Sequence, residues 1–330
     1  MYRFRPESPK AIAAAASAVL LLGMQSHAAA AAAPPYPSKP ILLVIPYEAG
    51  GSIDIVGRMV ADSLSKRLKT PIVVEQRPGG GGIIGTERVA RANADGHTLL
   101  MQNPSLLTTM VVGKPPYDLK AFAPVARLAS NVNGLAVSSK VPATSLKELI
   151  ALAKQQPGKL LAATTAVGAS AHIGLELFKI MAGIDVKTVH FKGAGQSVTD
   201  VVGGHSDMTS SSVTNLMPHM KSGRIRILAT GGLKRASFLP DIPTISEAGV
   251  PGYEHVNWWG ILAPAGVPAP VLSRLTTEIK AVMEDEETKK LLSAQGAEID
   301  LVMTSAFGAE LAKELSRVVE VVKKAKITTE

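Results

Sequence analysis

Residues 41–68 read ILLVIPYEAGGSIDIVGRMVADSLSKRL, and this stretch decides the fold. Ile41–Ile45 is a continuous apolar run, which is typical of a strand buried in a parallel sheet. After a glycine turn, an apolar residue stands at every fourth position: Val56, Val60, Leu64 and Leu68. That spacing predicts a helix with one buried face, so the stretch is the first half of a β-α-β unit.

The same alternation of strand and helix continues along the chain in two series. The first series adds strands at Ile72–Val74 and Thr98–Met101 around a helix near Ile84–Arg91. The second series follows an extended stretch at Val125–Ser138. It comprises a helix capped by Ser145 and Glu148, strands at Leu160–Thr164, Val186–His190 and Ile225–Thr230, and helices at His172–Met181 and near Gln196–Val202. We therefore predict an α/β fold with two lobes.

The last third of the chain predicts helices at Val271–Met283, Glu286–Ala294 and Phe307–Lys323. Because these helices lack a sheet of their own, we expect them to cover the first lobe. The chain then crosses between the lobes twice, near Val125–Leu135 and near Tyr253–Gly260, and two crossings make a hinge. Trp258 and Trp259 stand at the second crossing, either as hinge packing or as a stacking platform. The predicted boundaries are 34–130 with 256–330 for lobe 1 and 131–255 for lobe 2, with a ligand cleft between them.

The first residues have the pattern of a targeting segment. Arg3, Arg5 and Lys10 precede the apolar run Ala11–Gly23, and an alanine-rich stretch follows. We predict a cleaved secretory signal peptide over residues 1–33. The alternative is a transmembrane anchor, but the run is shorter than the ~20 residues that a spanning helix needs. The chain has no cysteine, which excludes a lipid anchor on cysteine and any disulfide. We expect export to the periplasm of a Gram-negative cell.

The formal net charge of +8 does not point to nucleic acid, because the basic residues are scattered and the chain is predicted to be exported. The excess serves either general solubility or weak steering of anionic ligands.

The turn Pro46–Asp54 is the first candidate site. Its paired glycines permit backbone conformations that other residues avoid, and the amides at the following helix start are unpaired. Such a turn binds anions without a cationic side chain, and Tyr47 is placed to stack on a ligand or to hydrogen-bond it. The alternative is an ordinary turn capped by Ser52 or Asp54.

A second turn, Thr164–His172, resembles the first in kind and adds the hydroxyls of Thr164, Thr165 and Ser170. If the two lobes face each other, both turns point into one cleft, which suits a ligand with two acidic ends or one with an acid and a polar group. The alternative is that Ser170 is only an N-cap. A third turn, Phe191–Gln196, carries Lys192 either as a charge at the rim of the cleft or as an isolated lysine.

Other chemistry finds little support in the sequence. The glycine run Gly79–Gly82 lacks the lysine and hydroxyl of a Walker loop, and its match to G-x-G-x-x-G stands alone. The histidines form no H-x-x-x-H pair, so we predict neither a metal nor another cofactor. Asp54, His172 and Ser170 can be assembled into a triad on paper only, and we predict no catalytic residues.

Five motifs together resemble the Bug family, the tripartite tricarboxylate transporter substrate-binding proteins of the TctC type. They are Tyr36-Pro37-x-Lys39-Pro40, Pro46-Tyr47-x-x-Gly50-Gly51-x-x-Asp54, Glu75-x-Arg77-Pro78-Gly79 with Gly81, Gly82 and Gly85, Ala94-Asp95-Gly96-x-Thr98-Leu99, and Trp259-Gly260-x-x-Ala263-Pro264-Ala265-Gly266. The resemblance implies a periplasmic-binding-protein-like fold of two Rossmann-like lobes joined by a hinge with two crossovers. It also implies that the Pro46–Asp54 loop holds a ligand carboxylate through backbone amides and bridging waters.

With the turns above, the resemblance gives one set of predicted ligand-binding residues. They are Tyr47, Ala49, Gly50, Gly51, Ser52 and Asp54 of the first loop, Asn103 and Ser105 after the third strand, Thr165, Ala166, Gly168, Ser170 and His172 of the second-lobe loop, Lys192 and Gly193 of the next turn, and Asp207. Departures from the family pattern lie at Glu48, Gln76, Ile83 and Ser210–Ser212, and they bear on the far end of the ligand.

The resulting hypothesis is a monomeric binding protein, not an enzyme, that delivers a carboxylate to the permease subunits of a tripartite tricarboxylate transporter. We expect a mono- or dicarboxylate, with a dicarboxylate favoured and aromatic acids among the candidates. The alternatives are a ligand sensor for a membrane histidine kinase and, more remotely, a periplasmic hydrolase.

Overall fold

The computed structural model describes residues 1–2, 36–294 and 296–327. The chain divides into two units, Met1–Ser38 and Lys39–Glu330, and every helix and strand below belongs to the second. Apart from Met1 and Tyr2, the predicted signal peptide lies outside the described residues. Within the described ranges, no helix combines the length and the apolar character needed to cross a bilayer.

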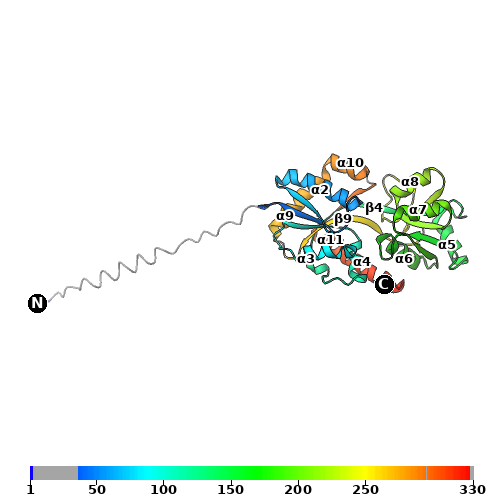
Figure 1. Ribbon diagram of the computed structural model, residues 1–330, viewed down its shortest axis with the longest axis horizontal. Coiled ribbons are helices and arrows are strands. Elements are labelled where there is room, and N and C mark those ends of the chain that lie inside the picture. Colours follow the sequence, from blue (N-terminus) through cyan, green and yellow to red (C-terminus); the bar gives the residue numbers. More distant parts are fainter. Residues whose placement is uncertain (3–35, 295, 328–330) are drawn as a thin grey trace. The chain divides into compact units, whose positions relative to one another are not determined.

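The second unit alternates strands and helices (Figure 1). The strands are β1 Ile41–Ile45, β2 Ile72–Gln76, β3 Thr98–Gln102, β4 Phe122–Ser138, β5 Leu161–Thr164, β6 Lys187–His190, β7 Met208–Ser212, β8 Ile225–Thr230, β9 Val256–Pro264 and β10 Glu298–Met303. The helices are α2 Ser52–Leu68, α3 Ile83–Ala90, α4 Ser105–Val112, α5 Leu146–Gln155, α6 Ser170–Ala182, α7 Ala194–Gly203, α8 Val213–Lys221, α9 Ala269–Glu284, α10 Glu286–Ala294 and α11 Thr304–Lys324.

The first lobe is built on the parallel strands β2, β1 and β3, and β9 joins β3 in antiparallel pairing. The apolar face of α2 is buried, as its spacing predicts, and α2 packs against β2 and α9. The predicted unit of strand, turn and helix is therefore confirmed.

The second lobe has the parallel strands β7, β5 and β6. Strand β4 pairs with β7 in antiparallel direction, and β8 pairs with β4, also antiparallel. Helices α5 to α8 surround these strands (green in Figure 1). A separate apolar cluster, which includes Val198 of α7 and Val213 and Leu216 of α8, is buried beneath these two helices.

Strand β4 belongs to both lobes, because its partner changes along its length. Up to Val132 it pairs with β9, and from Asn133 it pairs with β7. At this point the Gly231 amide donates to Asn133 O at 2.8 Å, and the His255 amide donates to Gly231 O at 2.9 Å. The predicted pair of crossings is thus present as one hydrogen-bonded ladder, which we call the hinge. The exact lobe boundaries stay a prediction.

The tryptophans after the second crossing are packing residues. Both Trp258 and Trp259 are buried, at 1% and 0% exposed. Trp258 packs edge-on against Phe307 of α11, with ring centroids 5.4 Å apart, and its Nε1 donates to Glu314 Oε2 at 2.9 Å. Neither ring has a free face for a ligand, so the interpretation of these residues as a stacking platform is wrong.

The last third departs from the sequence prediction in two respects. Glu298–Met303 forms β10, an edge strand antiparallel to β4, although no strand was expected there. All of its residues are partly buried, so burial does not distinguish one face of this strand from the other. Helix α11 contacts α6 of the second lobe as well as β4, so it covers more than the first lobe.

Candidate functional site

Four turns of the predicted site join the carboxyl end of a strand to a helix: β1 to α2, β3 to α4, β5 to α6 and β6 to α7. Parallel strands end at a common edge, so the first two turns share one edge of the first lobe and the last two share one edge of the second. A methyl group added to Gly168 would lie 3.6 Å from Thr108 Cγ2 of α4. The two edges therefore approach each other at the place where open α/β sheets bind ligands.

The helices after β1, β5 and β6 begin without a side-chain cap. Their N-cap residues are Gly51, Ala169 and Gly193, which carry no hydroxyl or carboxylate. Helix α5 differs, because Ser145 Oγ accepts the Glu148 amide at 3.3 Å. First-turn amides are the usual partners of an N-cap side chain or of a bound anion. In α2, α6 and α7 no N-cap side chain occupies the first-turn amides, which are therefore available to an anion.

This arrangement contradicts the readings of Ser52 and Ser170 as N-caps. Both residues are the first residue of their helix, one position after the N-cap. Within the described part of the chain, the amides of Ser52, Ile53, Ser170 and Ala171 have no acceptor. At least two open amides thus stand at the start of each of these two helices.

The amide just before the N-cap is used differently. In all three helices it donates to the side chain four residues later: Gly50 to Asp54 Oδ2 at 3.0 Å, Gly168 to His172 Nδ1 at 3.0 Å, and Lys192 to Gln196 Oε1 at 3.2 Å. These three amides are occupied within the protein. The side chains that accept from them set the shape of the loops.

Asp54 holds the first loop. It is 5% exposed, and its Oδ1 accepts from Arg58 Nε and Gln76 Nε2, both at 2.8 Å. Burial by itself raises the pKa of Asp54, but the Gly50 amide, the Arg58 charge and the Gln76 amide together hold it below its usual value. The carboxylate is therefore ionised and fully engaged, and it positions Gly50, whose φ is +83°.

Tyr47 connects the first loop to the turn after β3. Its hydroxyl lies 3.0 Å from Gln102 Oε1 and 3.3 Å from Asn103 Oδ1. Asn103 Oδ1 also accepts the Ser105 amide at 2.9 Å, at the start of α4. Burial raises the pKa of the Tyr47 hydroxyl, so it remains a donor. The structure thus brings together Tyr47, Asn103 and Ser105, and it adds Gln102, which the sequence prediction missed.

The last residue of the glycine run Gly79–Gly82 packs against the Tyr47 ring. Gly79 to Gly82 all have positive φ, and a methyl group on Gly82 would lie 3.3 Å from the Tyr47 ring. The space around Gly85 is smaller still, since a methyl group there would lie 2.6 Å from Arg77 O. Within the run only Gly82 approaches Tyr47, whereas a methyl group on Gly79 or Gly80 would meet the side chain of Ile84 or Ile83.

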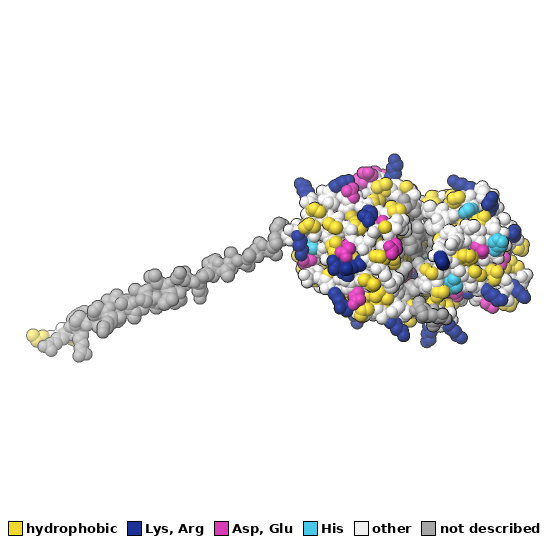
Figure 2. Space-filling model, viewed as in Figure 1, with side chains coloured by type: hydrophobic (Ala, Val, Ile, Leu, Met, Phe, Trp, Pro, Cys, Tyr) yellow, Lys and Arg dark blue, Asp and Glu magenta, His cyan; other side chains and the backbone are white. Residues whose placement is uncertain are grey.

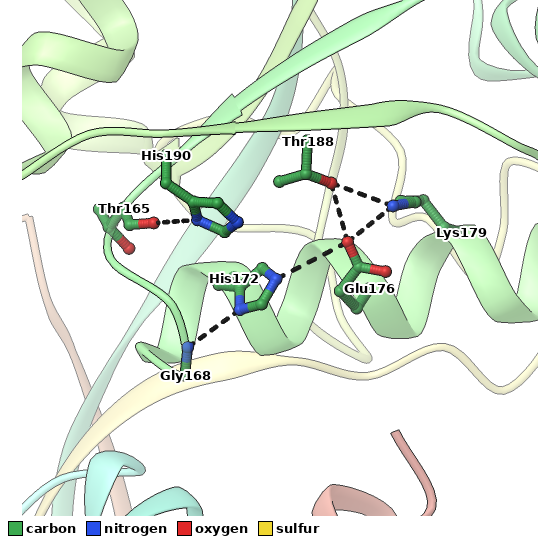
Figure 3. Close-up of polar contacts among 7 residues, drawn as sticks. All are labelled: Thr165, Gly168, His172, Glu176, Lys179, Thr188 and His190. Atoms are coloured by element: carbon green, nitrogen blue, oxygen red, sulfur yellow. Dashed lines mark hydrogen bonds and ion pairs between the residues drawn. The ribbon is translucent and has the colours of Figure 1, made fainter. Parts of the chain in front are cut away.

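His172 holds the second loop and rests on a buried network (Figure 3). Because Nδ1 accepts the Gly168 amide, the neutral ring carries its proton on Nε2, 3.8 Å from Glu176 Oε1. The same oxygen accepts from Lys179 Nζ at 2.7 Å and Thr188 Oγ1 at 2.9 Å. Burial lowers the pKa of His172 to about 4, so the ring is neutral at physiological pH.

Ser170 is tied to the hinge. Its Oγ lies 3.1 Å from His255 Nε2, and Tyr253 Oη donates to Gly174 O at 3.0 Å one turn further along α6. The start of α6 is therefore joined by side-chain contacts to the segment that leads into β9. Ser170, His172 and Asp54 each have other partners, so they form no triad.

The remaining predicted residues vary in their setting. Ala49 and Ala166 are exposed in their loops, and Thr165 Oγ1 is buried with no partner among the described residues. Lys192 is exposed and, in the described part of the chain, forms no ion pair, and Gly193 is the N-cap of α7. Ala49 thus lies in the first-lobe loop before α2, and the other four residues lie in the turns after β5 and β6 of the second lobe.

Asp207 lies elsewhere. It precedes β7, and its Oδ2 accepts the amide of Leu161 at the start of β5, at 2.8 Å. The loops of the site follow the ends of these strands, so Asp207 stands at the opposite end of the sheet. The structure does not bring it together with the other site residues, because an acidic position after a glycine pair does not reveal which end of a strand it occupies.

Charge is dispersed over the surface. Figure 2 shows Lys and Arg side chains spread around both lobes on the face in view, with no single basic patch. Among the described residues there is no group of three or more His, Asp and Glu placed to hold a metal ion.

The family model of the tripartite tricarboxylate transporter family receptor, TctC, matches residues 56–326. The chain belongs to this family. BugT of Bordetella pertussis is 32% identical over 266 residues, which cover 79% of this chain and 82% of that protein. The matched range begins just after the Pro46–Asp54 loop, so the description of that loop depends on the structure alone.

Solved structures of similar proteins extend the comparison. Rpa4515 of R. palustris with adipate has a TM-score of 0.72 and 32% identity, covering 89% of this chain and 99% of that one. MatC of Rhodopseudomonas palustris with bound malate has a TM-score of 0.68 and 26% identity, covering 87% and 100%. The predicted fold of a TctC-type periplasmic binding protein is therefore confirmed.

For a TctC-type receptor, several structural residues of the site escaped prediction from sequence. Gln76, Gln102 and His255 each contact a loop residue from a distant part of the chain, which are Asp54, Tyr47 and Ser170. The one local signal is a polar residue at the carboxyl end of a buried strand, as Gln102 is in TLLMQ.

Proposed function

We propose that this TctC-type receptor binds a small organic carboxylate between its two lobes. The observation that carries the proposal is the pair of uncapped helix starts, α2 and α6, whose open amides stand on the two facing edges. Each start adds the positive end of a helix dipole, which favours an anion. Two such starts favour a ligand with a carboxylate at each end, and the relatives named above hold adipate and malate, both dicarboxylates.

The proposal extends to the protein's place in the cell. It acts as an exported, monomeric periplasmic carrier that hands its ligand unchanged to membrane permease subunits. Ligand binding favours closure about the hinge, because a bound dicarboxylate bridges both lobes. Cell fractionation with N-terminal sequencing tests export, and uptake by cells lacking the gene tests delivery.

A thermal-shift screen of aliphatic and aromatic acids tests ligand binding. At about 100-fold excess over Kd, a ligand adds about 2.7 kcal/mol to stability, which corresponds to a rise in Tm of about 4 °C for a chain of this size. The neutral diamide of the same length is the matched control and should give no shift. Failure of every acid in the panel to shift Tm contradicts the proposal, and so does recovery of a chemically altered acid by mass spectrometry.

Two pairs of variants test the amides directly. Proline is favoured at the first helical position and lacks the amide hydrogen, so Ser52→Pro removes one open donor while keeping the helix start. Gly51 and Ala169 are both extended, which a following proline requires. We expect Ser52→Pro and Ser170→Pro to weaken carboxylate binding about tenfold in calorimetry. Ser52→Ala and Ser170→Ala retain the amide and lose only the hydroxyl, so equal losses in alanine and proline variants would contradict the amide mechanism.

A further inference from the structure

His190 stands beside the second loop, at the end of the neighbouring strand β6. It is the last residue of β6, it is exposed, and its Nδ1 lies 2.9 Å from Thr165 O in the loop that leads to α6. Its ring meets His172 edge-on, with centroids 4.6 Å apart (Figure 3). Within the described residues, its Nε2 has no hydrogen-bond partner.

The partners of the two rings fix opposite tautomers. A carbonyl oxygen only accepts, so His190 Nδ1 carries a hydrogen and Nε2 is the atom that gains or loses a proton. In His172 the Nδ1 atom must stay unprotonated, because it accepts the Gly168 amide. Protonation of His172 at Nδ1 therefore breaks its hydrogen bond with the Gly168 amide. His190 can take up a proton at Nε2 and keep its hydrogen bond to Thr165 O.

The charged groups around His190 allow such an uptake. From α6 it faces the neutral His172, and behind that ring lie Glu176 and Lys179, which form an ion pair at 2.7 Å. The turn after β6 adds the exposed Lys192. An anion at the open amides of α6 would add a negative charge next to the loop that His190 contacts, and a nearby anion favours the imidazolium form.

We propose that His190 is a proton-linked contact for the ligand carboxylate held by the second lobe. In its charged form the Nε2 hydrogen is donated to that carboxylate, so binding is accompanied by uptake of a proton on His190. The proposal rests on the proposed function, and it makes affinity for the carboxylate increase as pH falls through the histidine range. His190 would thus favour ligands that present a full negative charge to this loop.

The test is calorimetry of the full chain with the best dicarboxylate from the screen, between about pH 6.5 and 8.5, where carboxyl groups are ionised and histidine titrates. Titrations in phosphate and in Tris, which differ in ionisation enthalpy, measure the protons taken up. We compare wild type, His190→Gln and the control His205→Gln, an exposed histidine at the other end of α7. We expect the wild type and the control to lose about tenfold in affinity across this range with proton uptake, and His190→Gln to show neither.

The outcomes separate the two proposals. If the wild type binds no carboxylate, the proposed function falls and this inference with it. If the wild type binds and His190→Gln keeps the same pH slope and proton uptake, only the role of His190 is overturned. Should the glutamine variant fail to fold, as judged by its Tm without ligand, His190→Asn replaces it in the same comparison.

Discussion

Asp54→Asn tests whether a buried carboxylate sets the shape of the first ligand loop. The substitution keeps the size of the side chain but replaces one acceptor oxygen with a donor. In one orientation the new amide nitrogen faces the Gly50 amide, and in the other it faces Arg58 Nε and Gln76 Nε2. A donor meets a donor either way, so no orientation restores the native pattern.

The magnitude follows from the burial of this side chain. An unsatisfied buried donor costs about 1–3 kcal/mol, and Asp54 is 5% exposed, so we expect the free energy of unfolding to fall by about 2 kcal/mol. The asparagine oxygen should remain with Arg58 and Gln76, because that orientation keeps two bonds. Gly50 then loses its acceptor, the open amides of α2 lose their orientation, and the carboxylate Kd rises about tenfold.

Urea denaturation and calorimetry on the same samples measure both effects. Asp62→Asn is the matched control, because Asp62 lies on the same helix, its side chain is 66% exposed, and it pairs only with Lys66 in the described chain. We expect that variant to stay within about 0.5 kcal/mol of wild type with an unchanged Kd. If Asp54→Asn is destabilised yet binds within about twofold of wild type, the loop does not depend on Asp54 and the reasoning is refuted.

His172→Phe keeps a ring but removes the acceptor for the loop amide, so carboxylate affinity should fall about tenfold. In wild type the free energy of unfolding should decrease as pH falls from about 6.5 to about 4, because the unfolded chain protonates this histidine first, and urea titrations should show a shallower decrease in the variant. Glu314→Gln should raise the free energy of unfolding on the order of 1 kcal/mol at about pH 8 and not at about pH 5, because burial raises the pKa of Glu314 to about 7 and disfavours its ionised form. Gly82→Ala should cost more stability in urea than Gly223→Ala, because both have positive φ but only the methyl at 82 meets a ring, at 3.3 Å; equal costs would show that this contact is unimportant.

The parts of the fold that depend on local pattern were predictable from sequence. The spacing of apolar residues predicts α2, and the predicted helix Glu286–Ala294 matches α10 at both ends. Both signals lie within one or two helical turns. By contrast β7, MTSSS, and β10, EIDLVM, form because each finds a partner in β4, which no local pattern reveals.

The candidate site divides in the same way. Glycine turns before helices predict where the open amides lie, because that geometry is local. Which atoms face each other is not local: His190 meets Thr165 from another strand, and His255 reaches Ser170 across 85 positions of sequence. A prediction from position in a motif also failed at Asp207, where only the strand pairing shows the end of the sheet at which it lies.

The contrast between helix starts suggests that binding here is achieved at the expense of helix stability. Helix α5 anchors the amide before its N-cap on Glu148, as the site helices do on their own side chains, but it also has the Ser145 cap. Gly51→Ser should supply α2 with the missing cap, because Gly51 is extended (φ −76°, ψ 163°) and the atom nearest to an added Cβ is Glu48 O at 4.0 Å. The new hydroxyl would occupy a first-turn amide that the ligand needs. We therefore expect a gain of up to about 1 kcal/mol in unfolding free energy together with weaker carboxylate binding. The reverse change, Ser145→Ala in α5, should lose a similar amount of stability without affecting Kd. Stabilisation by Gly51→Ser with full affinity would mean that the carboxylate does not use these amides.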